Sequence, residues 1–257
     1  VLDEINSYKD SPSELIFDDF EELIYPDHPF GKNILGTKKR VKNFSKTSII
    51  NFIEQNYNTD QMVFCSVGNI PFSRIKRLAE RYFGNIPPNL RTKNRKPTPY
   101  SSPIAKEVNK NTYQQHCIVG CKAYELKHPK RIGLHLLNNI LGGPGQNSRL
   151  NMVLRERNGF AYNVESNYSP YSDTGVFSIY FGSDKANFSK SLDLLHRELK
   201  IIRNKRLGVQ QLLKAKRQLI GQLAIASENM EALMLNVARS FLFFNSFESL
   251  TDIYSKI

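Results

Sequence analysis

The spacing of hydrophobic residues predicts two helices in the first 25 positions of the chain. The first helix has its hydrophobic positions at helical spacing, namely Val1, Leu2, Ile5 and Tyr8. No capping residue precedes Val1, so the chain is expected to begin inside a helix. The stretch SPSE, from Ser11, predicts a capping box with proline at the first position of the second helix. The apolar face of that second helix consists of Ile16, Phe17, Phe20, Leu23 and Ile24.

Between residues 45 and 86 the pattern predicts a helix, a strand and another helix. The first of these starts at Ser45 or Thr47 and turns isoleucines and a phenylalanine inward. The run MVFCSVGNI, residues 62–70, is short and apolar and ends in turn-forming residues, which is typical of a strand. A helix is predicted after Pro71, and Gly84 is expected to end it.

The pattern after residue 103 predicts antiparallel strands and long helices. The stretch YQQHCIVGCKAY alternates as a strand does, and RIGLHLLNNILGG is an amphipathic helix that ends in two glycines. Two β-rich runs follow, and the turn residues Pro170, Asp173 and Gly175 between them favour antiparallel pairing. Helices are predicted over residues 186–203 and over residues 209–244, the latter with a break at Ser227.

A proline-rich, basic and aperiodic stretch, residues 87–103, predicts a linker between two domains. We therefore expect a first domain over residues 1–90, a linker over 91–103 and a second domain over 104–257. The final stretch, LTDIYSKI, is amphipathic and lacks a closing cap, so the second domain is also expected to be truncated at its C-terminus.

Composition describes a globular protein of 257 residues, with 40% hydrophobic and 23% charged residues. The net charge of +12 makes nucleic acid a partner to consider. The basic residues fall in small separate groups without an RNP, KH or helix-turn-helix signature, so a solvated surface is favoured and no nucleic-acid partner is expected. No apolar stretch is long enough to span a membrane. The compartment stays open, being cytoplasmic or periplasmic if the protein is bacterial.

The cysteines and histidines do not form a local metal motif. Cys65, Cys117 and Cys121 lack C-x-x-C spacing and lie in apolar segments, which favours buried reduced thiols. The five histidines are scattered, and none belongs to an H-E-x-x-H or H-x-x-E-H motif. His135, on an apolar helix, is interpreted as a packed core or boundary residue. Glu4, taken alone, is more typical of a helix surface than of a metal ligand.

The glycine cluster GGPGQNSR, residues 142–149, is not a phosphate-binding P-loop. It lacks the G-K-[ST] ending and follows a helix rather than a strand. We interpret it as a flexible break before a helix that Ser148 caps and Gly159 ends.

Arg155 and Tyr162 lie seven positions apart, at the end of that helix and at the start of the next strand. A guanidinium and a phenol are both good hydrogen-bond donors to a peptide carbonyl or a developing oxyanion. The alternative, a surface arginine and a half-buried strand tyrosine, is left open by spacing alone.

Two long stretches carry a resemblance to a known family. VLDEINSYKDSPSELIFDDFEELIYPDHPFGKNILG and GGPGQNSRLNMVLRERNGFAYNV together resemble the pitrilysin, or insulinase, family of zinc metallopeptidases, especially its bacterial and processing-peptidase-like members. The resemblance implies an α+β fold of two related halves, each a mainly antiparallel sheet flanked by helices, of which the first is incomplete here. It also implies that Glu4 is the third zinc ligand and that Arg155 and Tyr162 bind the substrate backbone.

The family's H-x-x-E-H segment is absent from this sequence. Two zinc ligands and the general base are therefore missing, so no catalytic residue is expected in this chain, and zinc is expected only in the complete enzyme. The resemblance implies part of a zinc-dependent endopeptidase that acts on unfolded peptides and is inactive as an isolated chain. The alternative is a non-catalytic substrate-binding or assembly subunit that pairs with a partner bearing H-x-x-E-H. Expected partners are peptide substrate and the missing N-terminal half or a homologous subunit, with a homodimer as a further possibility.

Overall fold

The computed structural model describes the whole chain except residues 10, 93–97, 99–101 and 111. It contains two compact units, each built from two separate stretches of chain. Unit 1 comprises Val1–Asn43 and Lys96–Arg217, and unit 2 comprises Phe44–Arg95 and Gln218–Ile257. The linear division into residues 1–90 and 104–257 stays a prediction, and most of the expected linker, 91–103, lies outside the described residues.

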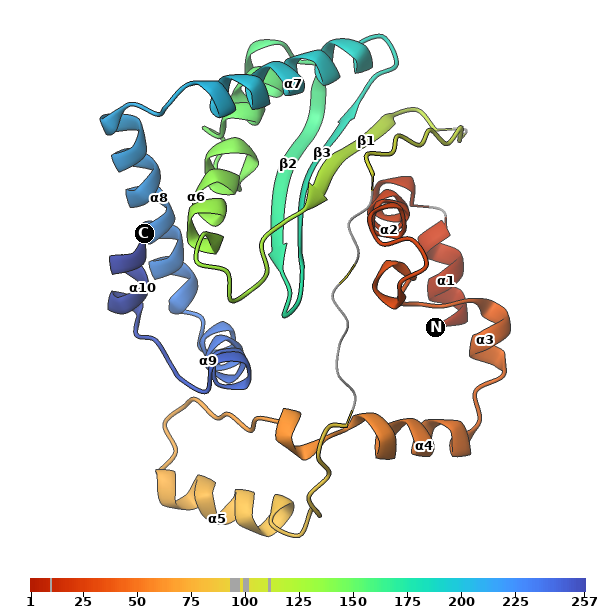
Figure 1. The fold of residues 1–257 in the computed structure, drawn as a ribbon, viewed down its shortest axis with the longest axis vertical. Coiled ribbons are helices and arrows are strands. Elements are labelled where there is room, and N and C mark those ends of the chain that lie inside the picture. Colours follow the sequence, from red (N-terminus) through yellow and green to blue (C-terminus); the bar gives the residue numbers. More distant parts are fainter. Residues whose placement is uncertain (10, 93–97, 99–101, 111) are drawn as a thin grey trace. The chain divides into compact units, whose positions relative to one another are not determined.

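Unit 1 contains a three-stranded antiparallel sheet (Figure 1). Its strands are β1 (Gln115–Lys122), β2 (Ala161–Pro170) and β3 (Gly175–Ser183), in the order β1-β3-β2. A tight connection joins β2 to β3, as the turn residues predicted. The expected α+β class, with an antiparallel sheet and flanking helices, is confirmed.

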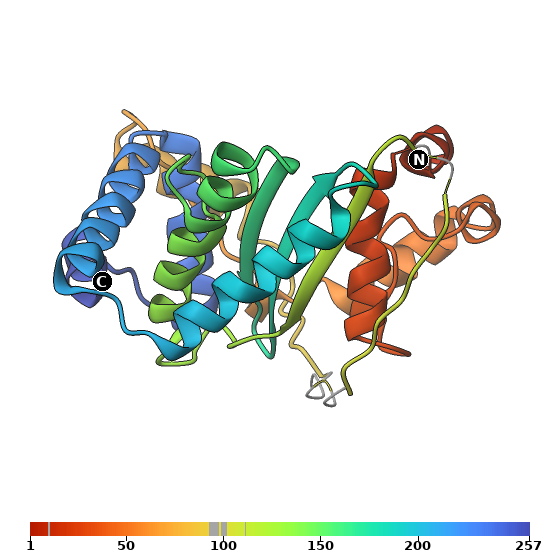
Figure 2. The ribbon, with the colours of Figure 1, turned by 90° about the horizontal axis from the view of Figure 1, so that it is seen from above.

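One face of the sheet carries the main hydrophobic core. Helix α6 (Arg131–Gly142) packs along β2, and helix α7 (Phe188–Asn204) lies over the same face (Figure 2). β3 is buried along almost its whole length because it is the central strand. The core consists of Leu141, Leu150, Leu154, Ala161, Val164, Ile179, Phe181 and Leu195. His135 is half-buried, with its ring 4.6 Å from that of the buried Tyr168, which confirms its predicted boundary position.

The opposite face of the sheet is covered by the first stretch of the chain. This stretch forms α1 (Leu2–Lys9), α2 (Pro12–Ile24), the 3₁₀ turn Pro29–Gly31 and α3 (Lys38–Lys42). α2 packs against β1, and the ring of Phe17 lies 5.3 Å from that of Tyr180. Just past α2, the Tyr25 hydroxyl donates to the carbonyl oxygen of Gly175 at 3.2 Å. Residues 1–43 therefore belong physically to the sheet formed by residues 115–183.

Helix α2 begins where the pattern predicted, but without the predicted capping box. Ser11 has φ −111° and ψ 86°, and its side chain makes no capping hydrogen bond. The Ser11 hydroxyl instead lies 3.5 Å from the Ser13 hydroxyl. Since a capping serine needs extended backbone to direct its oxygen at the helix, this cap prediction is wrong.

Gly120 is a position at which the close packing of β1 against β3 can be tested. A Cβ there would overlap the Phe177 carbonyl oxygen and lie 3.0 Å from the Ser178 Cα, both of which are backbone atoms of β3. We expect Gly120→Ala to destabilise unit 1 by about 1–3 kcal/mol, the usual cost of overpacking. Gly133→Ala in α6, where a Cβ meets nothing within 4 Å, should instead be neutral or stabilise by up to about 1 kcal/mol. Urea unfolding of both variants measures this, and equal midpoints would contradict the packing described.

Unit 2 consists of helices and connecting segments. Its elements are α4 (Lys46–Asn56), the 3₁₀ turn Thr59–Gln61, α5 (Phe72–Phe83), the end of α8 (Val209–Ser227), α9 (Met230–Phe244) and α10 (Leu250–Lys256). Ser45 caps α4 and Gly84 follows the end of α5, and the predicted break at Ser227 is confirmed.

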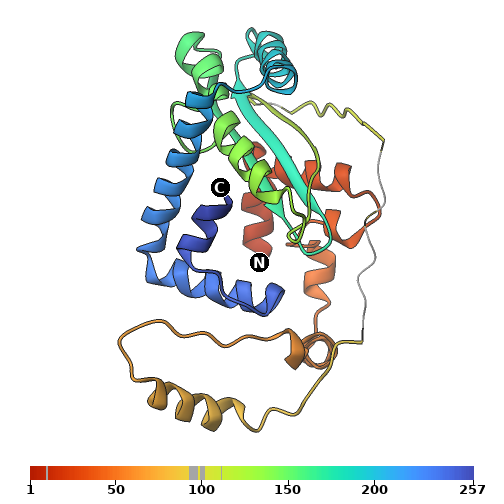
Figure 3. The same ribbon diagram turned by 60° about the vertical axis from the view of Figure 1, so that its left-hand side comes forward.

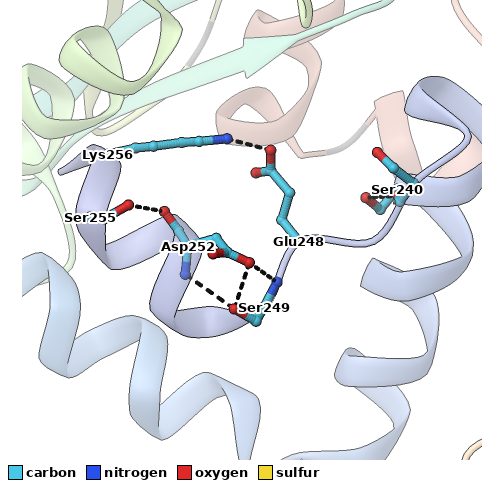
Figure 4. Close-up of polar contacts among 7 residues, drawn as sticks. Ser240, Glu248, Ser249, Asp252, Ser255 and Lys256 are labelled. Carbon is cyan, nitrogen blue, oxygen red and sulfur yellow. Dashed lines mark hydrogen bonds and ion pairs between the residues drawn. The ribbon is translucent and has the colours of Figure 1, made fainter.

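Helix α10 starts with a full capping box (Figure 4). The Asp252 backbone N–H donates to the Ser249 hydroxyl at 3.2 Å, and the Ser249 backbone N–H donates to the Asp252 carboxylate at 3.0 Å. The Ser249 hydroxyl also donates to the Asp252 carboxylate at 2.6 Å, and this hydrogen bond, together with the one from the Ser249 backbone N–H, lowers the pKa of Asp252. The same close-up shows an ion pair between Lys256 and Glu248, which ties the end of the helix to the segment before it.

The strand predicted at residues 62–70 is absent from the structure. These residues form no regular element, and the described residues of unit 2 include no strand with which they could pair. A strand requires a neighbour for its backbone hydrogen bonds, so an apolar run alone does not make one. No described residue of unit 2 is buried. Its exposed hydrophobic side chains include Ile49, Phe52, Phe64, Phe83, Leu235 and Phe241.

The three cysteines are free, as predicted, but their burial differs. Cys65 and Cys117 are half-buried, and burial raises the pKa of the Cys117 thiol to about 11, which keeps it protonated. Cys121 is exposed, so the prediction of a buried thiol is wrong there. Within the described part of the chain, no helix is both long and apolar enough to cross a bilayer.

Candidate functional site

The helix after the glycine cluster is a π-helix over Asn151–Arg157. The hydrophobic pattern had predicted an ordinary helix capped by Ser148 and ended by Gly159. Gly159 does end it, with a left-handed φ of +62°. Ser148 does not cap it. The Ser148 hydroxyl is buried and has no hydrogen-bond partner among the described residues. π-helical turns are rare and frequently occur at functional sites, so this segment is a candidate functional site.

Arg155 lies on this π-helix with 50% of its side chain exposed. Its Nε lies 3.7 Å from Oε1 of the neighbouring Glu156. Such a half-exposed neighbour leaves most of the five guanidinium donors available. The side chain lines a surface depression of about 320 Å³.

This depression, which we call the β2 groove, lies between a loop and a strand edge. One wall is the glycine-rich loop, residues 142–146, and the other is residues 163–167 of β2. Arg155 and Asn151 of the π-helix complete the lining. Figure 3 shows α6, which leads into the loop, lying along the sheet. The lining is mainly polar, since three of the five β2 residues are Asn163, Glu165 and Asn167.

An ion pair with α7 holds the start of this segment. Arg149 donates to one carboxylate oxygen of Glu198, from Nε at 3.0 Å and from Nη2 at 2.7 Å. Glu198 is buried and Arg149 is half-buried. Two charge-assisted hydrogen bonds in this partly buried setting fix the chain just before the π-helix, and thereby position Arg155.

Tyr162 lies at the start of β2, and 58% of it is exposed. Its hydroxyl donates to Asp184 Oδ1 at 2.8 Å. That hydrogen bond, together with the negative charge of the carboxylate, raises the pKa of Tyr162. Tyr162 does not line the β2 groove, and among the described residues no hydrogen bond joins it to Arg155. A joint role for these two residues stays a prediction.

The effect of the Asp184 carboxylate on the pKa of Tyr162 can be tested. Asp184→Asn should shift phenolate formation at Tyr162 to lower pH, because the neutral amide no longer opposes the negative phenolate. The native protein should keep the O–H donor to higher pH. A ¹³C NMR titration of labelled tyrosine, assigned with Tyr162→Phe, measures the shift. An unchanged midpoint would mean that the Asp184 contact is not made in solution.

Glu4 lies on α1, and 62% of its side chain is exposed. Its carboxylate is 3.9 Å from the ammonium group of Val1. The described residues contain no group of three or more histidine, cysteine or acidic side chains that could hold a metal ion. A catalytic zinc needs three protein ligands, so the residues present here do not fit zinc by themselves. The role of Glu4 as one ligand of several stays a prediction.

Sequence reasoning missed the residues that surround Arg155. Asn163, Glu165 and Asn167 alternate with buried positions along β2, and this polar alternation was the available signal. Asp184 and Glu198 could not be recognised from a local pattern. The partner of Asp184 is Tyr162, 22 positions away, and the partner of Glu198 is Arg149, 49 positions away.

The chain is similar to known proteins over essentially its whole length. A family model described as the peptidase M16 inactive domain matches residues 43–219. A Rickettsia felis protein named "Uncharacterized zinc protease" is 30% identical over 263 residues, covering 100% of this chain and 62% of that protein. The probable mitochondrial-processing peptidase subunit beta of Schizosaccharomyces pombe is 25% identical, over 94% of this chain and 55% of that protein.

A solved structure shares the fold. The crystal structure of a peptidase M16 inactive domain from Pseudomonas fluorescens matches with a TM-score of 0.77 at 20% identity, covering 98% of this chain and 63% of that one. The chain thus spans about three fifths of the length of these relatives. Since the family model covers more than half of the sequence, the chain belongs to the peptidase M16 family, as its likeness to the pitrilysin-type zinc metallopeptidases predicted.

Proposed function

We propose that this chain is the peptide-binding part of a zinc-dependent endopeptidase that acts on unfolded peptides. The observation that carries the proposal is the match to the M16 inactive domain over residues 43–219, among relatives named as zinc proteases. In this proposal Arg155 and Tyr162 donate hydrogen bonds to a backbone carbonyl of the bound peptide near the scissile bond. Arg155 is suited to this task because it is half exposed at the rim of the β2 groove.

Arg155 and Tyr162 differ in how readily they could donate a hydrogen bond to a bound peptide. Arg155 has five N–H groups and no acceptor, so it can bind a carbonyl while keeping its contact with Glu156. Tyr162 has a single O–H, which it donates to Asp184. Its hydroxyl must therefore turn away from Asp184 before it can donate to a peptide. Arg155 carries the larger part of the proposed binding.

The remaining chemistry would come from residues outside this chain. The described residues contain no group that could supply the other zinc ligands, the general base would also come from elsewhere, and Glu4 would contribute one carboxylate. The exposed hydrophobic side chains of unit 2 fit this proposal, because a partner domain or subunit would cover them. That partner would be either further parts of the same polypeptide or a homologous subunit.

The test compares this chain with the complete protein. Both are incubated with zinc and a fluorogenic unfolded peptide, with and without a chelator. We expect turnover that the chelator abolishes in the complete protein, and no turnover from residues 1–257 alone. Chelator-sensitive cleavage by the isolated chain would show that it holds a full metal site.

A second candidate function is a non-catalytic subunit. It is favoured by the similarity to a protein named as a processing-peptidase subunit. In that case the chain would supply Arg155 and Tyr162 to a separate polypeptide that bears H-x-x-E-H. Sequencing the complete reading frame decides between the two: an H-x-x-E-H motif in the same polypeptide supports the peptidase, and its absence supports the subunit. Activity restored on mixing with a separate H-x-x-E-H subunit would confirm the latter.

A further inference from the structure

We infer that Asp184 is a positioning residue that competes with the bound peptide for the hydroxyl of Tyr162. This inference rests on the proposed function, because it takes Tyr162 to donate a hydrogen bond to a peptide carbonyl. It adds a resting state, in which Asp184 holds the donor, and the condition under which the donor is released.

Tyr162 is the extra residue of a β-bulge. In the pairing of β2 with β3, Ala161 lies opposite Ser183 and Asn163 lies opposite Gly182. Since those two β3 residues are adjacent, Tyr162 is inserted between two paired positions of β2. Tyr162 and Asn163 are both exposed, which interrupts the alternation of the strand. Bulges are common beside active sites, where they re-aim a side chain, so the bulge marks Tyr162 as a functional position.

The turn after β3 holds Asp184 independently of Tyr162. The Asp184 backbone carbonyl accepts the Asn187 backbone N–H at 3.1 Å and the Ser183 hydroxyl at 3.2 Å. The Asn187 side-chain amide donates to Asp184 Oδ2 at 3.5 Å, and the Tyr162 hydroxyl donates to Asp184 Oδ1 at 2.8 Å. Since 58% of Tyr162 is exposed, the carboxylate is the fixed acceptor and the tyrosine is the partner that can move.

The two acceptors open to the Tyr162 hydroxyl differ in charge. A phenol has one O–H, so a hydrogen bond to the peptide replaces the one to Asp184. Hydrogen bonds to an ionised acceptor are roughly twice as strong as those between neutral groups. The carboxylate therefore retains the hydroxyl against a neutral peptide carbonyl. When the carbonyl oxygen gains negative charge in the transition state, it becomes an acceptor of the same kind, and the hydroxyl can transfer to it.

The hydrogen bond to Asp184 stabilises the resting protein and thereby raises the barrier to the transition state. Asp184→Asn leaves a neutral acceptor, which releases the hydroxyl at lower cost. We expect this substitution to raise kcat/KM of the complete protein about three- to tenfold, as for exchanging a charge-assisted hydrogen bond for a neutral one. Asp193→Asn, which removes the same charge from an exposed position on α7, should leave kcat/KM within about twofold of the native value.

The experiment is a double-mutant cycle in the complete protein, assayed with its H-x-x-E-H subunit if that motif lies on a separate polypeptide. It measures kcat/KM for a fluorogenic unfolded peptide with Asp184→Asn, Tyr162→Phe and the double variant. Tyr162→Phe should lower kcat/KM, and in its background Asp184→Asn should bring no gain, because the hydroxyl for which Asp184 competes is gone. Asp184→Ala, which removes the acceptor, should act in the same direction and replaces Asp184→Asn if that variant does not fold.

Several outcomes would overturn the inference. A loss of activity in Asp184→Asn would make Asp184 a support that orients Tyr162 and not a competitor. An equal gain with and without the Tyr162 hydroxyl would assign the gain to the removed charge alone. No effect of Asp184→Asn, beside a loss in Tyr162→Phe, would reject the competition and keep the proposed role of Tyr162. If Tyr162→Phe has no effect, the proposed role of Tyr162 fails and the inference fails with it.

Discussion

Arg155→Ala is expected to lower kcat/KM of the complete protein about 100- to 1,000-fold, the usual effect of losing one donor to a developing oxyanion. The reason is that a guanidinium half exposed at the β2 groove would be the principal donor to the peptide carbonyl. Because the contact should strengthen as negative charge develops, the loss should fall mainly on kcat. Steady-state kinetics with a fluorogenic peptide measures it.

Arg157→Ala is the matched control for this prediction. Arg157 lies on the same π-helix and is exposed, but it does not line the β2 groove. The Arg157→Ala substitution should leave kcat/KM within a few-fold of the native value. Arg155→Lys should give an intermediate loss, because it keeps the charge without the planar fork. If Arg155→Ala and Arg157→Ala behave alike, Arg155 has no special role in substrate binding.

Phe181→Ala is expected to destabilise unit 1 by about 3–5 kcal/mol, as for other buried phenylalanines cut back to alanine. Phe181 is fully buried on β3, the central strand of the sheet, and its ring lies 5.6 Å from that of Phe188 on α7. Losing it would leave a cavity between the sheet and its covering helices. Because the chain has no tryptophan, urea unfolding is followed by circular dichroism and tyrosine fluorescence.

Ile34→Ala provides the comparison, because Ile34 also belongs to unit 1 and is 95% exposed. Its effect should stay within about 0.5 kcal/mol, as is usual for surface substitutions. A Phe181→Ala variant that unfolds at the native urea concentration would contradict the core described here. A variant that no longer folds at all would be replaced by Phe181→Leu, with a smaller loss expected in the same direction.

The helices were largely predictable because their signals are local. The periodicity of apolar residues located α2, α4, α5, α6 and α7, and the end of α5 at Gly84 was read from a single residue. Strands were predictable only where partners exist within the chain. β1, β2 and β3 formed as expected, whereas the apolar run 62–70 did not form a strand, because the part of the chain that the structure describes places no strand beside it.

The candidate site was predictable in part. Arg155 and Tyr162 were selected from residue type, spacing and a family resemblance, and their roles stay predictions. The polar edge of β2 and the acidic partner of Tyr162 were not found. Asp184 lies on the far side of the β2–β3 hairpin, and only the antiparallel pairing of those strands brings it within 2.8 Å of the Tyr162 hydroxyl.

By itself, the sequence determined the positions of most helices, the antiparallel strands after residue 103 and the M16 family, since each depends on short patterns or on motif order. Only the tertiary structure decided that residues 1–43 pack on the sheet of residues 115–183, that the helix bearing Arg155 is π-helical and that β2 borders a groove. The physical reason is that these features arise from contacts between residues far apart in the chain. Local periodicity records which face of an element is apolar and not which partner covers it.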